Sequence, residues 1–147
     1  MSQEDKQLLL KDLCARLPYG IKAQLTELDD NDGSEYYTEC RIMGVKDNQL
    51  VNFIRIIKSK EIGEEQWFNI SFFKPYLRPM SSMTEEEKEQ VFYSIDVITD
   101  ENYGDSYSPA AWEAMNYFVE YCDSHYLDHR GLIQRGLALE APKEMYC

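Results

Sequence analysis

Residues that could bind a metal or act as a nucleophile gather in one short stretch, residues 122–129, which reads CDSHYLDH. It holds both histidines of the 147-residue chain, His125 and His129, together with Cys122. Spacings of three and four residues would place these three side chains on one face of a continuing helix. A thiolate and two imidazoles are good zinc ligands, and a thiol beside a histidine can serve as a nucleophile. The stretch therefore allows a small metal-dependent or thiol enzyme.

The same stretch is also typical of a helix end. Cys122 continues an apolar stripe, where a free cysteine behaves as a small hydrophobic residue. Gly131 follows closely, so we expect the helix to end before His129. A fourth ligand would have to come from elsewhere, and no second cluster in the sequence offers one. We favour the helix end and expect no cofactor, and we keep Cys122, His125 and His129 as the candidate metal ligands.

A second stretch approaches a calcium-binding loop. In residues 28–39, LDDNDGSEYYTE, the carboxylates of Asp30, Asp32 and Glu39 stand at the third, fifth and twelfth positions of such a loop. The first position, which must supply a carboxylate, is Leu28, and strand-like segments flank the loop. We therefore predict a hairpin turn. The sequence contains neither a glycine-rich phosphate-binding loop nor a GxSxG motif, so we expect a protein that is not an enzyme.

The first half of the chain predicts a helix followed by a small sheet. Leucines spaced three and four residues apart predict a helix over residues 3–17. β-branched and aromatic runs over residues 20–28, 35–45 and 50–58, joined by two short turns, predict an antiparallel β-meander. Residues 66–73 could add a fourth strand. The fold class is therefore α+β.

A connector and a helical half follow. Pro75 and Pro79 predict an irregular connector over residues 74–83. Thr84 and Glu87 have the spacing of a capping box, which predicts a helix start. A second helix is expected to have its N-cap at Ser108 and its first residue at Pro109, and to end at about Ser124. Its buried stripe is expected to contain Trp112, Met115, Phe118, Val119 and Cys122. We expect one domain over residues 1–147, with a β-rich lobe over about 1–78 and an acidic helical lobe over about 79–147.

The acidic charge is concentrated in one third of the chain. The net charge is −12, and residues 79–129 contain 12 acids and one base, Lys88. A field of a single sign can steer a basic partner, or occupy a groove built for a phosphate backbone. A solvated surface that only maintains solubility is the alternative. The candidate partner-binding residues are Glu85, Glu86, Glu87, Glu89, Asp100, Glu101, Asp105, Glu113, Glu120 and Asp123.

Other classes of partner are disfavoured. The N-terminus has charges where a signal peptide needs an apolar run, and no apolar stretch is long enough to cross a bilayer, so we expect a cytoplasmic protein with free thiols and no membrane contact. Arg41, Arg55, Lys58 and Lys60 could form a basic sheet face, but the acidic remainder would repel phosphate. We therefore expect no direct binding of nucleic acid. The oligomeric state stays open.

The segments FKPYLRPMSSMTEEE and HYLDHRGLIQRGLALEAP, with KDLCARLPYGIKAQL near the N-terminus, resemble small uncharacterised proteins of phages and prophages of gut Bacteroidales. This resemblance assigns no role to any residue. It implies a bacterial cytoplasm and a mobile genetic element. Small acidic phage proteins in that setting often inhibit host defence enzymes, some of them by imitating nucleic acid.

Our leading hypothesis is a non-enzymatic, phage-encoded interaction protein. It would inhibit a host defence or nucleic-acid-handling protein by engaging a basic surface with its acidic, nucleic-acid-mimicking helices. The alternatives are the small metal-dependent or thiol enzyme, and a virion or assembly component.

Overall fold

The computed structural model describes residues 1–91 and 109–146, and the chain divides into two compact units. Unit 1 comprises Met1–Leu77 and Arg130–Cys147, and unit 2 comprises Arg78–His129. Residues 130–147 were expected in the helical lobe but belong to unit 1. Apolar side chains explain this difference, because Leu132 and Leu137 of this segment are buried.

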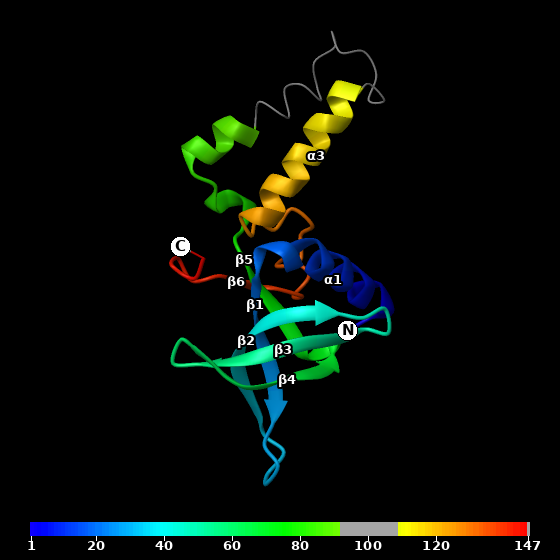
Figure 1. Cartoon of the computed structure of the whole chain (residues 1–147), viewed down its shortest axis with the longest axis vertical. Helices are drawn as coiled ribbons and strands as arrows, with labels where there is room; N and C mark the ends of the chain where they lie inside the picture. Colours follow the sequence, from blue (N-terminus) through cyan, green and yellow to red (C-terminus); the bar gives the residue numbers. More distant parts are fainter. Residues whose placement is uncertain (92–108, 147) are drawn as a thin grey trace. The chain divides into compact units, whose positions relative to one another are not determined.

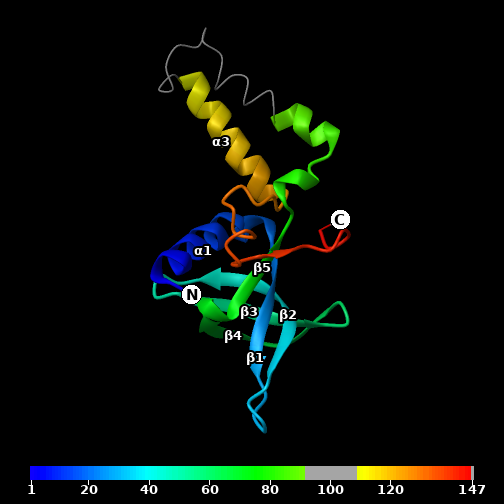
Figure 2. The same ribbon diagram turned by 180° about the vertical axis from the view of Figure 1, so that it is seen from behind.

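The N-terminal helix is confirmed as α1, Gln3–Arg16. The Ser2 side chain accepts the Asp5 N–H, and the Asp5 side chain accepts the Ser2 N–H, which forms a capping box. The predicted leucine spacing buries Leu9 and Leu13 completely. A short 3-10 helix, η1, Leu17–Tyr19, follows. In Figures 1 and 2 α1 lies against the sheet, where it contacts β2 (Glu35–Val45).

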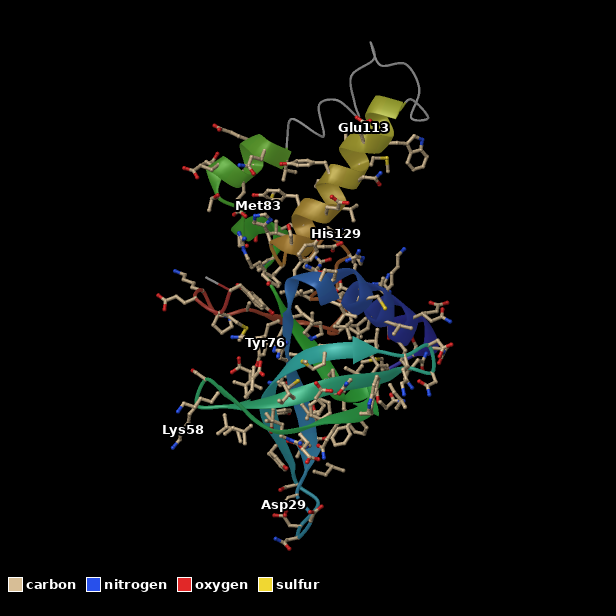
Figure 3. All side chains as sticks on the ribbon, viewed as in Figure 1. Asp29, Lys58, Tyr76, Met83, Glu113 and His129 are labelled. Atoms are coloured by element: carbon tan, nitrogen blue, oxygen red, sulfur yellow. The ribbon has the colours of Figure 1, made fainter. Side chains whose placement is uncertain are left out.

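The predicted antiparallel meander is also confirmed. Its strands are β1, Ile21–Leu28; β2, Glu35–Val45; β3, Leu50–Ile57; and β4, Lys60–Asn69. Each pairs antiparallel with the next, and Lys58 and Asp29 lie in two of the connecting turns (Figure 3). The fourth strand begins and ends earlier than residues 66–73, because the chain bends there into a 3-10 helix, η2, Ile70–Phe72.

The core of unit 1 lies on one face of this sheet. Ile21, Ala23 and Leu25 alternate along β1 and are completely buried, as their period of two predicts. The other buried side chains of the strands are Cys40, Ile42, Val51, Phe53, Phe73, Pro75 and Leu77.

The prediction of an irregular connector around Pro75 is wrong. Residues Phe73–Leu77 form β5, which pairs antiparallel with β1, and β6, Leu139–Glu140, pairs parallel with β5. The sheet thus has six strands in the order β4-β3-β2-β1-β5-β6. The Ala141 N–H donates to the Leu77 carbonyl at 2.8 Å, so the backbone groups of Leu77 point toward the C-terminal segment and away from β1. Backbone groups alternate in direction along a strand, so those of Pro75, two residues earlier, point the same way. Proline at position 75 therefore removes no hydrogen bond to β1.

Unit 2 contains the two expected helices. After η3, Met80–Ser82, a helix covers residues 85–91, and α3 is Pro109–Ser124. Val91 of the first helix and Tyr121 and Cys122 of the second belong to one buried apolar cluster. Pro109 begins α3 as predicted, whereas the expected cap Ser108 lies outside the described residues. The C-terminal half is only partly helical, since residues 130–146 form turns and β6.

Candidate functional site

The helix over residues 85–91 begins at the predicted capping box. The Thr84 hydroxyl accepts the Glu87 N–H at 3.1 Å, and the Glu87 carboxylate accepts the Thr84 N–H at 3.0 Å. That carboxylate also accepts two hydrogen bonds from the Arg78 guanidinium, at 2.7 and 3.0 Å. The Arg78 bonds are the main reason that the pKa of Glu87 falls to about 2.

Glu87 is therefore a structural residue. Its side chain is only 14% exposed and its charge is neutralised by Arg78. The Arg78 guanidinium also donates to the carbonyls of Ser82 and His125, at 3.2 and 3.4 Å, so it joins the chain before the helix to the end of α3. The expectation that Glu87 binds a partner is corrected, because its carboxylate is already occupied.

The remaining acids of this helix face solvent. Glu85, Glu86 and Glu89 are exposed, and at 100° per residue they lie on the side opposite the buried Val91. Lys88 lies 3.3 Å from the Glu85 carboxylate, in an exposed pair of the kind that contributes little to stability. The helix thus presents an acidic row of three carboxylates.

The expected acidic line of α3 is present in part. Glu113, Asn116 and Glu120 are exposed on the side away from Cys122, and Glu113 lies toward the start of the helix (Figure 3). Asp123, by contrast, is only 4% exposed and lies 2.9 Å from the His129 ring nitrogen Nε2. Asp123 is therefore a structural residue, and its proposed place on the partner-binding line is corrected.

The prediction for the buried stripe of α3 is wrong at three positions. Trp112, Met115 and Val119 are 50%, 41% and 37% exposed, and only Cys122 of the predicted stripe is fully buried, with Phe118 half-buried. The buried side of the helix instead carries Ala114, Tyr121 and Cys122. With the half-buried Phe118 counted in both, the two sets recur at three and four residues, and the position of Val91 and Leu127 in the cluster selects the second set.

The CDSHYLDH stretch is a helix end, as favoured. Tyr126 has a φ of 61°, and the N–H groups of Tyr126 and Leu127 donate to the carbonyls of Asp123 and Cys122, at 3.4 and 2.9 Å. This pair of bonds defines a Schellman motif, and Leu127 and Cys122 supply the apolar contact that accompanies it.

The candidate metal ligands consequently point to different surroundings. Cys122 is buried in the apolar cluster, His125 stacks on the Tyr121 ring with centroids 4.0 Å apart, and His129 contacts Asp123. Figure 3 places His129 beyond the end of α3. Within residues 1–91 and 109–146, no group of three or more histidine, cysteine or acidic side chains could hold a metal ion. Cys14 and Cys40 are free thiols.

The near-match to a calcium loop is a hairpin turn, as predicted. The Asp29 carboxylate accepts the N–H groups of Asn31 and Asp32, at 2.7 and 3.3 Å, and the Asp29 N–H donates to the Ser34 carbonyl at 2.8 Å. These bonds close the loop between β1 and β2.

The arginines of the sheet do not form a basic face. The Arg41 guanidinium is paired with Glu61, and the Arg55 guanidinium is paired with Glu27. Arg55 also lies over the ring of the buried Phe53, at 5.2 Å from its centroid. These pairs neutralise the charges of Arg41 and Arg55, two of the four candidate residues.

Three of the candidate carboxylates, Asp100, Glu101 and Asp105, lie outside the described residues.

Arg78 was not singled out from the sequence, where a single arginine between Leu77 and Pro79 carries no recognisable signal. Trp112, Met115 and Val119 are exposed, and their helical spacing alone predicts burial, so the sequence does not identify them as surface residues.

In the part of the chain that the structure covers, no helix has both the length and the apolar character needed to cross a membrane.

Comparisons of the chain with protein-family models, with curated proteins and with solved structures find no match.

Proposed function

We propose that the protein is a non-enzymatic interaction protein that binds a protein partner by a basic surface on that partner. The observation that supports this most is the outer side of α3. Glu113 and Glu120 are exposed there, no cationic partner is found for either among the described residues, and residues 109–124 contain no lysine or arginine.

The use of charge elsewhere in the chain strengthens this contrast. Arg41, Arg55 and Arg78 are each paired with a carboxylate, and the buried Asp12 accepts hydrogen bonds from Arg16 and Arg130. Such pairing satisfies the charges within the fold. The carboxylates on the outer side of α3 form no ion pair within the described fold. A cationic partner would be steered toward them and would pair with them.

The contact is placed on α3 and not on both helices together. The acidic row of the helix over residues 85–91 and the acidic line of α3 each face away from the apolar cluster that contains Val91 and Cys122. The two sets of carboxylates therefore do not make one continuous patch. Glu113 and Glu120 are seven residues apart, about 10 Å along the helix axis, which suits a pair of basic side chains on one partner element.

The resemblance to phage proteins extends the proposal to a setting. The partner would be a host defence or nucleic-acid-handling protein in a bacterial cytoplasm, and the acidic helix would occupy a groove whose lysines and arginines normally bind phosphates. The protein would then act as an inhibitor without chemistry of its own.

The test is charge reversal on each helix separately. The double variant Glu113→Lys/Glu120→Lys should abolish capture of the partner from a bacterial lysate, and Glu86→Lys/Glu89→Lys should have a smaller effect. The matched control is Glu64→Lys/Glu144→Lys, which changes the net charge equally at exposed positions of unit 1. Circular dichroism checks that each variant remains folded.

Ionic strength provides the second readout. Because exposed charges more than a Debye length apart, about 10 Å at 0.1 M salt, are screened, capture should weaken steeply as salt is raised. Capture that is equally strong at low and high salt, and equally strong for the α3 and control variants, would refute the electrostatic contact.

A further inference from the structure

An exposed apolar stripe runs along α3 between its buried side and its acidic line. Trp112, Met115 and Val119 are spaced three and four residues apart, and they are 50%, 41% and 37% exposed. Isolated exposed apolar residues are ordinary, but three aligned along two turns form a continuous patch. We name these three residues the α3 stripe.

Among the described residues of unit 2, the α3 stripe does not belong to the buried apolar cluster. The core side of the helix carries Ala114, Tyr121 and Cys122, and the stripe lies next to that side along the helix surface. Tryptophan and methionine supply large contact areas and are enriched at the centres of interfaces. A solubilising surface would place polar residues at these positions.

The charges beside the α3 stripe indicate which kind of partner binds there. Around the helix, Asn116 follows the stripe, and Glu113 and Glu120 follow Asn116. A second copy of this chain docked on the same side would place carboxylates against carboxylates, which is unfavourable. A partner element with an apolar ridge and lysine or arginine beside it would pack on the stripe and form ion pairs with the acids.

The spacings specify that element further. Trp112 and Val119 are seven residues apart, and so are Glu113 and Glu120. The apolar row and the charged row share a seven-residue repeat. A partner helix matches this repeat if its apolar residues are spaced three and four apart and its basic residues lie seven apart on the flank of that apolar ridge. Extended segments present side chains every second residue and do not match this repeat over two turns.

We infer that the surface of α3 formed by the α3 stripe and the adjoining acidic line is a docking site for a basic amphipathic helix of the partner. The apolar ridge of that helix packs on the α3 stripe, and its lysines or arginines pair with Glu113 and Glu120. This inference depends on the proposed function and adds the secondary structure and residue pattern of the partner element to it.

The test uses two synthetic peptides and the full-length chain. One peptide is a helix with leucines spaced three and four apart and lysines on the flank, and the other is a scrambled peptide of the same composition. The background variant Trp67→Phe leaves Trp112 as the single tryptophan, because the chain contains two. The patterned peptide should shift Trp112 emission to shorter wavelength and bind at least about tenfold more tightly than the scrambled one.

Three double variants separate the inference from the proposed function. Calorimetry should show the patterned peptide binding about tenfold more weakly to Trp112→Gln/Val119→Gln. The control Ile57→Gln/Ile62→Gln removes similarly exposed apolar residues from unit 1 and should leave the affinity unchanged. Glu113→Lys/Glu120→Lys should weaken the binding of both peptides.

The remaining outcomes overturn the inference in distinguishable ways. Equal binding of both peptides, lost in the charge-reversed variant, would refute the docked helix while the acidic contact stands. Binding of the patterned peptide that is unaffected by Glu113→Lys/Glu120→Lys would refute the acidic contact, and with it the basic flank of the proposed helix. No binding of either peptide at low salt would overturn the inference.

Discussion

The ion pair between Glu87 and Arg78 makes the stability of unit 2 depend on pH. Hydrogen bonds from Arg78 lower the pKa of Glu87 from an ordinary value of 4.5 to about 2. A carboxyl group with a lower pKa in the folded state stabilises that state above its unfolded pKa, and this contribution is lost as pH falls through the folded pKa. A pKa difference of this size corresponds to about 3 kcal/mol at neutral pH. The side chain is only 14% exposed, so solvent screens the pair weakly.

The variant Glu87→Gln should therefore lower the free energy of unfolding of unit 2 by about 2–3 kcal/mol at neutral pH. Urea unfolding followed by far-UV circular dichroism measures this loss. The matched control is Glu86→Gln, which removes an exposed carboxylate from the same helix and should change stability by less than about 0.5 kcal/mol.

The pH dependence gives the sharper discrimination. The stability difference between the original protein and Glu87→Gln should persist above pH 4.5 and shrink as the pH is lowered toward about 2, where Glu87 takes up its proton. If Glu87→Gln is no more destabilising than Glu86→Gln, or if its effect is the same at both ends of that range, the structural role assigned to Glu87 is wrong.

Three further predictions concern unit 1. Lys58 and Ser59 both have positive φ, 53° and 64°, in the turn between β3 and β4, so Lys58→Asn/Ser59→Gly should raise stability by about 1 kcal/mol in urea unfolding; a loss of stability would contradict this. Burial raises the pKa of the Cys40 thiol to about 12, so at pH 8 alkylation should label the exposed Cys14 and leave Cys40 unlabelled until the protein unfolds, and rapid labelling of Cys40 in the folded state would count against its burial. Tyr146→Phe removes a hydroxyl that bonds the backbone of β1 and β5, and should cost about 1 kcal/mol; an unchanged melting temperature would show that this hydroxyl does not hold the C-terminal segment.

Local signals explain which elements could be predicted from the sequence. The alternation of Ile21, Ala23 and Leu25 depends only on the pleat of one strand, and the capping box of Thr84 and Glu87 depends only on one helical turn. These features were confirmed because no distant residue is needed to form them.

Long-range contacts explain the errors. Pro75 predicts a break in regular structure, because proline has no N–H to donate to a strand partner. The partners of β5 are β1 and β6, which lie far from it in the sequence, so this pairing cannot be read from the residues around Pro75. In an acid-rich run all carboxylates look alike, and Arg78 distinguishes Glu87 from its neighbours only once the chain has folded. In the same way, His129 distinguishes Asp123 from Glu120.

The choice of buried face on α3 has the largest consequence for function. The sequence offers two apolar sets at helical spacing, one with Trp112 and Val119 and one with Ala114 and Tyr121, and they share Cys122. Periodicity alone cannot decide between them, because the apolar partner that covers the helix lies elsewhere in unit 2. The structure buries the second set, so residues that were expected to stabilise the core become part of the candidate binding site.

Photo-crosslinking from α3 tests the central claim most directly. Asn116 is exposed between the α3 stripe and the acidic line, so Asn116→p-benzoylphenylalanine places a photoreactive group at the proposed contact, and Glu64→p-benzoylphenylalanine places one on unit 1 as a control. On illumination in bacterial cells we expect position 116 to form an adduct with a protein that has a basic surface. That adduct should disappear when Glu113→Lys/Glu120→Lys is added. Adducts that form equally from both positions, or an adduct from position 116 that survives the charge reversal, would contradict binding through the acidic side of α3.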